Sequence, residues 1–183
     1  MGRIFTVSKV LAIDTSTSRS CVAIIDGTDV LYSGFRDGAT AHGPSLPALV
    51  QEALAVSDVD EVVVGMGPGP FTGLRVGIAF AQSFALAREI PVRGVCSLDA
   101  IAAQITDKDF IITVDARRKE VYWARYTDGN RVGDPAVNFP ADVTGAMIHA
   151  DLFPDMVALV NLSGNIVEPM YLRRPDAVAT ADR

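Results

Sequence analysis

An apolar run that closes on an aspartate occurs twice in this chain, and this repeat constrains the fold more than any other feature. The first run ends at Asp14 and the second at Asp115, and each is followed by a short polar stretch and another apolar run. A separation of about 100 residues is too long for a solenoid unit and fits two copies of an α/β lobe. The alternative is that strand, aspartate, turn and strand recurred by chance.

The hydrophobic spacing predicts the elements of the first lobe. Continuous apolar runs between turn residues are typical of buried strands, and apolar residues three or four positions apart are typical of helices. We therefore expect strands at residues 10–14, 21–25, 30–35, 62–65 and 92–96, and helices at residues 44–56, 71–88 and 98–105. The predicted order of the first lobe is βββαβαβα.

The second lobe gives weaker signals. We expect strands at 111–115 and 121–126, loops at 134–135, 139–142 and 153–155, a short helix at 143–148, an apolar run at 156–162 and a closing element at 169–175. The expected domains are an N-terminal tail (1–9), a first lobe (10–106), a shortened second lobe (107–175) and a C-terminal tail (176–183). The expected fold class is α/β, with duplicated lobes of mixed sheets flanked by helices.

Charge and composition exclude several classes of function. Sixteen Lys and Arg against 22 Asp and Glu give a net charge of −6, so nucleic acid could be held only through a local patch or a partner. Cys21 and Cys96 lie in apolar runs, and His42 and His149 are the only histidines, so no metal site is expected. Because no apolar stretch has the length of a signal core or a membrane span, we expect a cytoplasmic protein without membrane contact.

The first polar stretch is a candidate phosphate-binding hairpin. Asp14, Thr15 and Ser16 follow a strand, as in folds that present hydroxyls and backbone amides to nucleotide phosphates. The matching stretch at 116–120 has neither glycine nor threonine, and its bulky side chains leave no cradle for a phosphate. We therefore favour a structural hairpin in which Asp14 caps local amides, and we expect no cofactor.

A second candidate is the glycine-rich junction GMGPGPFTGLRVG at residues 65–77. It lacks the Gly-Lys-Ser/Thr ending of a P-loop and the spacing of the dinucleotide fingerprint, so nucleotide binding by this loop alone is not expected. The helix that follows carries small residues every fourth position: Gly73, Gly77, Ala81 and Ala85. Such a stripe permits close approach of another element. That element is either a neighbour within the lobe or a partner protein.

No other catalytic constellation is present in the sequence. There is no G-x-S-x-G nucleophile elbow, and neither cysteine has a histidine nearby in sequence. We predict no catalytic residue.

Four motifs together resemble the TsaB/YeaZ family. They are IDTST (13–17), the glycine-rich junction (65–77), VDARRKEVY (114–122) and PMYLR (169–173), in this order along almost the whole chain. The junction is the specific motif, and IDTST alone would be weak. The resemblance implies two actin-like lobes of the ASKHA superfamily, with a ribonuclease H-like core, and a relation to the M22 glycoprotease group.

The resemblance also implies a function. The family belongs to the bacterial machinery that makes threonylcarbamoyladenosine in tRNA, as a catalytically silent scaffold for the TsaD paralogue, together with the ATPase TsaE. Helices of the first lobe form the joint, and tRNA would be reached only through the complex. On this basis the expected contact residues are Leu49, Phe71, Gly73, Leu74, Gly77, Ile78 and Ala81. The short second lobe departs from the family pattern.

Two alternatives stay open. One is a free-standing enzyme, either an ATP-using phosphotransferase of the actin fold or a peptidase of the M22 type. The other is a homodimer through the same helices when the partner is absent.

Overall fold

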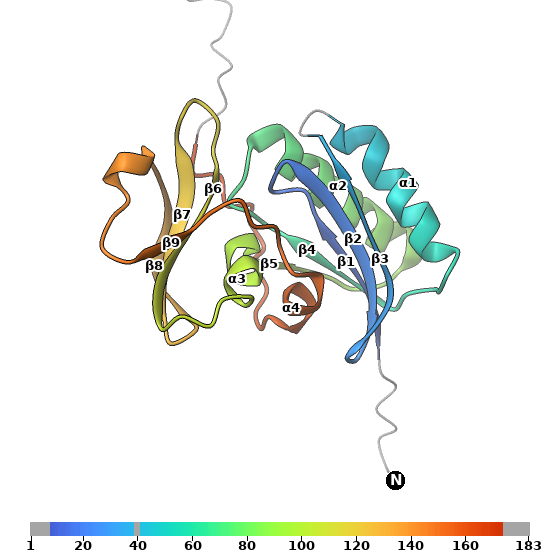
Figure 1. Cartoon of the computed structure of the whole chain (residues 1–183). Helices are drawn as coiled ribbons and strands as arrows, with labels where there is room; N and C mark the ends of the chain where they lie inside the picture. Colours follow the sequence, from blue (N-terminus) through green and yellow to red (C-terminus); the bar gives the residue numbers. More distant parts are fainter. Residues whose placement is uncertain (1–7, 39–40, 174–183) are drawn as a thin grey trace, which may run out of the picture.

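The computed structural model describes residues 8–38 and 41–173, which form two β-sheets with four α-helices (Figure 1). The first sheet has the order β3-β2-β1-β4-β5. Its strands are β1 (Lys9–Asp14), β2 (Arg19–Asp26), β3 (Asp29–Asp37), β4 (Glu61–Gly65) and β5 (Val92–Val95). β1 to β3 form an antiparallel meander, and β4 and β5 are parallel to β1. A mixed sheet with buried central strands results, because β1 and β4 are apolar on both faces.

Helices cover both faces of the first sheet. α1 (His42–Leu54) and α2 (Phe71–Arg88) pack on one face, where Leu11, Val62 and Leu74 belong to a single core. α3 (Ser97–Ala102) and α4 (Met156–Asn161) cover the opposite face, where Ala100 and Leu159 meet the other side of β1, β2 and β4. Because side chains alternate along each strand, they pack into two separate cores, one on each face of the sheet.

The second sheet repeats the arrangement of the first. Its order is β8-β7-β6-β9, with β6 (Asp109–Asp115), β7 (Val121–Thr127), β8 (Asn130–Asn138) and β9 (Met147–His149). β6 to β8 are an antiparallel meander, and β9 is parallel to β6 just as β4 is parallel to β1. The predicted α/β fold of duplicated lobes is confirmed. Within the described residues the second sheet ends at β9, whereas the first continues to β5.

Two expectations for the second lobe were wrong. The loop predicted at 134–135 lies inside β8, where Pro135 is tolerated because β8 is an edge strand with a shifted register against β7. The helix predicted at 143–148 does not form, and Met147–His149 pairs with β6 as β9. Short apolar runs do not distinguish a helix from a strand, and here pairing with β6 determined the conformation of the segment.

The predicted closing element connects the two lobes. Just before it, Ile166 donates its backbone N–H to the carbonyl of Gly94 on β5; within it, Met170 donates to the carbonyl of Met66. Arg173 then donates to the carbonyl of Ala116 in the second lobe and pairs with Glu120. The last residues predicted for this element, 174 and 175, lie outside the described residues, as do the terminal tails except residues 8 and 9.

Candidate functional site

Asp14, at the end of β1, is completely buried, and both of its carboxylate oxygens accept hydrogen bonds from neighbouring residues. One carboxylate oxygen accepts hydrogen bonds from the backbone N–H (2.8 Å) and the hydroxyl (2.7 Å) of Ser16. The other accepts the hydroxyl of Ser97, at 2.6 Å, from the start of α3. Burial raises the pKa of Asp14, and the hydrogen bonds from Ser97 and Ser16 oppose that rise. The side chain therefore joins β1, its turn and α3.

Thr15 connects the same turn to α2. Its hydroxyl donates to the carbonyl oxygen of Gly73 at 2.8 Å and accepts the backbone N–H of Gly77 at 3.1 Å. A Cβ atom on Gly77 would lie 2.2 Å from this hydroxyl oxygen. The small residues at these two positions are thus explained by the approach of Thr15 to the helix backbone.

Replacing Thr15 by valine removes this bridge and leaves the shape of the side chain almost unchanged. We expect Thr15→Val to lower the free energy of unfolding by about 1–2 kcal/mol, because the buried polar groups of α2 lose a partner. Thr15→Ser keeps the hydroxyl and should lose less than half as much. Denaturation by urea measures both, and equal losses in the two variants would contradict the role of the hydroxyl.

The glycine-rich junction closes over the hairpin. Gly69 lies so near the backbone of Ser16 that a Cβ there would be 2.4 Å from the Ser16 carbonyl oxygen. Asp14, Thr15 and Ser16 are each at most 1% exposed. The hydroxyls of Thr15 and Ser16 are bonded within the lobe. Protein groups are therefore bonded to the hydroxyls that a phosphate-binding hairpin would present to a ligand.

The second hairpin, between β6 and β7, has an unusual backbone. Arg117, Arg118 and Lys119 all adopt left-handed conformations, with φ of 64°, 54° and 65°. Such conformations cost non-glycine residues about 1 kcal/mol each. Asp115 stabilises the turn by accepting the backbone N–H of Arg117 at 2.8 Å. The three side chains are exposed, so the turn shows a basic surface in place of a glycine-lined loop.

His42 is the buried histidine of the site. It begins α1, is 4% exposed, and its Nδ1 lies 2.7 Å from the hydroxyl of Ser20 on β2. Burial lowers the pKa of His42, and the nearby carboxylate of Asp14 opposes this effect. Its ring carbon and nitrogen would lie 3.0 Å from a Cβ on Gly73. His42 therefore fills the space between α1, α2 and the hairpin, a role that the sequence gave no reason to expect.

The residues expected to contact a partner lie mostly in the core of the first lobe. Phe71 alone is partly exposed, and its ring packs 4.9 Å from that of Tyr171. The other six are buried under α1 and α2: Leu49, Gly73, Leu74, Gly77, Ile78 and Ala81. That these six contact a partner stays a prediction; the small stripe of α2 faces β1 and its turn. In the first lobe it serves internal packing.

The solvent-facing side of α1 and α2 carries other residues. On α1 these include Pro44, Pro47 and Ala48, and on α2 they include Ala79 and Leu86, whose side chain is 81% exposed. We call this solvent-facing side the helical face. The sequence contained a signal for it, since these positions alternate with the buried Leu46, Leu49 and Ile78 at helical spacing.

Among the described residues there is neither a cluster of metal ligands nor a helix that could span a membrane. No three His, Cys, Asp or Glu side chains among residues 8–38 and 41–173 are placed to hold a metal ion. Over the same ranges, no helix has the length and apolar character needed to span a membrane. Cys21 and Cys96 are buried free thiols, and burial raises the pKa of each to about 12.

Comparisons with known proteins agree with the fold. Residues 37–174 match the family model described as TsaD: tRNA N6-adenosine threonylcarbamoyltransferase. The chain is 46% identical to an uncharacterized protein of Mycobacterium tuberculosis H37Rv, covering 93% of this chain and 94% of that protein. That alignment runs over 200 residues, so the relative has residues with no counterpart among the 183 here.

Several relatives are described by function, as TsaB or YeaZ proteins. The TsaB protein of Escherichia coli K12, a tRNA threonylcarbamoyladenosine biosynthesis protein, is 38% identical over 64% of this chain and 54% of its own length. Among solved structures, YeaZ from Pseudomonas aeruginosa aligns with a TM-score of 0.71 at 26% identity, over 84% of this chain and 90% of that one. A second P. aeruginosa structure, described as similar to peptidase YEAZ, gives a TM-score of 0.77 at 26% identity, over 91% of this chain and all of that one.

Proposed function

The chain belongs to the TsaB/YeaZ family, and from this premise we propose that it is a non-catalytic scaffold subunit of the complex that forms threonylcarbamoyladenosine in tRNA. A role in the biosynthesis of this modified nucleoside follows from the family. The scaffold role is the finer statement that the geometry supports.

The proposal rests on the hairpin that follows β1, because its polar groups are already hydrogen-bonded within the protein. A nucleotide-using actin-like lobe needs hydroxyls and amides that face a phosphate. Here the carboxylate of Asp14 is bonded to Ser16 and Ser97, and Thr15 is bonded to α2. Gly69 lies against the backbone of Ser16. These contacts would have to break before a phosphate could reach the hairpin.

The proposed partners are those of the family: a TsaD-like paralogue as the catalytic subunit and a TsaE-like ATPase. We assign the contact with the paralogue to the helical face, where Leu86 and a group of alanines and prolines are exposed. An interface needs apolar side chains at its centre, and Leu86 supplies one. The net charge of −6 disfavours direct binding of tRNA by this subunit, so tRNA would be held by the complex as a whole. The proposed place of action is the cytoplasm.

Reconstitution tests the function. With a threonylcarbamoyl donor supplied, we expect purified TsaD-like and TsaE-like proteins to modify tRNA only when this chain is present, and the chain alone to be inactive. Equal modification with and without it would refute the scaffold role. Calorimetry with ATP and Mg²⁺ on the isolated chain covers the enzymatic alternative, and tight binding would support that alternative in place of the scaffold.

Charged side chains on the helical face should weaken the complex. We expect Ala48→Arg with Ala79→Arg to reduce affinity for the TsaD-like partner by about tenfold or more, because two cations would have to be desolvated in the interface. The melting temperature should stay unchanged, since both positions are exposed in helices. Ala141→Arg, at an exposed position of the second lobe, is the matched control. Undiminished affinity of the double variant would exclude this face.

A further inference from the structure

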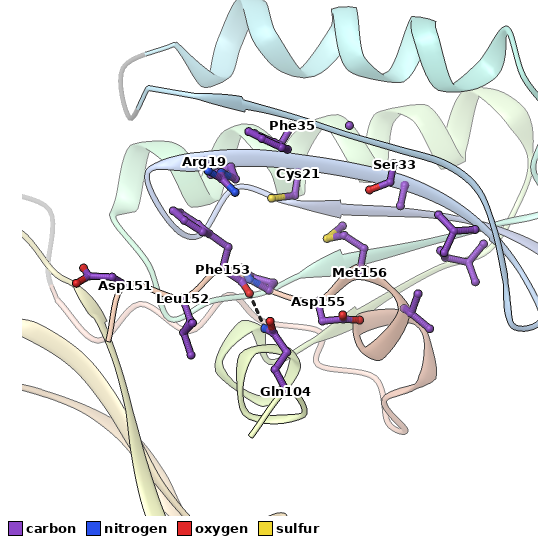
Figure 2. A pocket seen from close by; sticks show the side chains of 16 residues that line it. Arg19, Cys21, Ser33, Phe35, Gln104, Asp151, Leu152, Phe153, Asp155 and Met156 are labelled. Atoms are coloured by element: carbon purple, nitrogen blue, oxygen red, sulfur yellow. Dashed lines mark hydrogen bonds between the residues drawn. The ribbon is translucent and has the colours of Figure 1, made fainter. Parts of the chain in front are cut away.

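An open groove of about 460 Å³ lies on the face of the first sheet opposite α1 and α2 (Figure 2). One wall is made by β2 and β3, and the other by residues 151–157, which lead into α4. Cys21, Ala23 and Ile25 of β2 lie beneath it, each at most 6% exposed, because alternate residues of a strand share a face. Met156 and Val157 face them from the other wall. The groove lining is therefore mixed: Val30, Phe35, Met156 and Val157 are apolar, and Arg19, Ser33, Gln104, Asp151 and Asp155 are polar or charged.

One end of the groove is closed by an arginine side chain that stacks between two aromatic rings. The guanidinium of Arg19 lies 3.9 Å from the ring centre of Phe35 and 3.8 Å from that of Phe153, and Figure 2 shows the three side chains stacked. Arg19 also forms an ion pair with Asp37 at 2.8 Å. The single cation that lines the groove is thus neutralised and held in place.

β3 borders the groove and is the outermost strand of its sheet in the described part of the chain. Its nine residues contain neither lysine nor proline, and its one cation, Arg36, pairs with Glu52 of α1. Val30 is 49% exposed and Phe35 is 51% exposed, and both line the groove. An edge of this kind can accept another strand through its backbone groups.

Acidic side chains surround this edge. Asp29 and Asp37 lie at the two ends of β3, and Asp151 and Asp155 lie on the opposite wall of the groove. Asp37 is already paired with Arg19, and Asp155 accepts the backbone N–H of Ala158, so Asp29 and Asp151 are the carboxylates chiefly available to a cation. For a second copy of the chain, charge disfavours one register of pairing with this edge. Antiparallel pairing centred on Ser33 would place Asp29 of one copy opposite Asp37 of the other, and like charges in that position are destabilising.

We propose that β3 and the groove bind an extended segment of another protein, which is apolar at alternate positions and carries Lys or Arg at both ends. The segment adds a strand to β3, its apolar side chains enter the groove beside Met156, and its cations meet the surrounding aspartates. This surface is separate from the helical face, so the proposal does not depend on the proposed function.

Synthetic peptides test the proposal. The probe is the nine-residue peptide Lys-Lys-Val-Thr-Val-Thr-Val-Lys-Lys, labelled for fluorescence anisotropy with the full chain. We expect saturable binding that weakens as salt is raised. Replacing all four lysines by glutamate should reduce the affinity by about tenfold or more. Methylating two adjacent central amide nitrogens of the peptide should also reduce the affinity by about tenfold or more. Successive N–H groups of a strand point to opposite edges, so one of the two must face β3.

A variant of the chain completes the test. Ser33→Trp fills the groove from β3 and should reduce the affinity for the lysine peptide by about tenfold, whereas Ala48→Trp on the helical face should leave it unchanged. Equal binding of the lysine and glutamate peptides, equal binding of the methylated peptide, or no binding at all would each overturn the proposal. So would a dimer in sedimentation that Ser33→Trp dissociates, since the occupant would then be a second copy.

Discussion

Gly65→Ala is expected to lower the free energy of unfolding by about 3 kcal/mol, which corresponds to a fall of roughly 10 °C in melting temperature. Gly65 ends β4, beside the carboxylate of Asp14 at the end of β1. A Cβ at this position would lie 1.8 Å from a carboxylate oxygen of Asp14 and 2.5 Å from the hydroxyl of Ser97. Both groups are buried and hydrogen-bonded, so neither can move away without breaking a bond.

Gly43→Ala is the matched control for this variant. Gly43 lies in the first turn of α1, and nothing is within 4 Å of a Cβ built there. Alanine is the better helix former, so the control should be neutral or more stable by up to about 1 kcal/mol. Calorimetry on the two variants measures the difference. A Gly65→Ala protein as stable as the control would show that the carboxylate of Asp14 lies elsewhere in solution.

The second large effect is expected at Asp14. Asp14→Ala should cost about 3 kcal/mol of unfolding free energy, because the N–H of Ser16 and the hydroxyl of Ser97 lose their buried acceptor. The two substitutions should also be coupled. In the double variant Asp14→Ala with Gly65→Ala, the new methyl group enters the space left by the carboxylate. The combined loss should therefore be smaller than the sum of the single losses by about 1–2 kcal/mol.

The pH dependence of Asp14→Asn separates the charge of this side chain from its shape. Burial raises the pKa of Asp14 above its ordinary value of 3.8, so the folded protein favours the protonated carboxyl. That contribution to stability is present below pH 3.8 and is lost as the pH rises through the raised pKa. Asparagine does not ionise, so its stability relative to the native chain should increase over that pH range.

Urea denaturation of the native chain and Asp14→Asn at a series of pH values checks this expectation. The difference in unfolding free energy should change by at most about 1.4 kcal/mol per pH unit and then level off. Glu61→Gln, at a partly exposed carboxylate on the same sheet, is the control. Parallel pH profiles for the native chain and Asp14→Asn would show that burial does not control the ionisation of this group.

Local sequence was sufficient for most of the secondary structure. α2 begins and ends where the apolar spacing placed it, at Phe71 and Arg88, and the strands of the first sheet differ from prediction by one or two residues at their ends. The repeated run ending at Asp115 predicted the first two strands of the second meander, β6 and β7, but not β8. The prediction was wrong for residues 143–148, because a segment of six residues has too little periodicity of its own and takes its conformation from the strand beside it.

By itself the sequence determined that the helix at 71–88 has a stripe of small residues and that Asp14 ends an apolar strand. Only the tertiary structure decided what those residues touch. Thr15 bonds to Gly73 and Gly77 across 58 and 62 positions of sequence, and Ser97 reaches Asp14 across 83. Helical spacing fixes which side chains share a face but not the direction in which that face turns. The direction is set by packing against the sheet, so the stripe is internal and the exposed side of the helix is the one that the sheet does not cover.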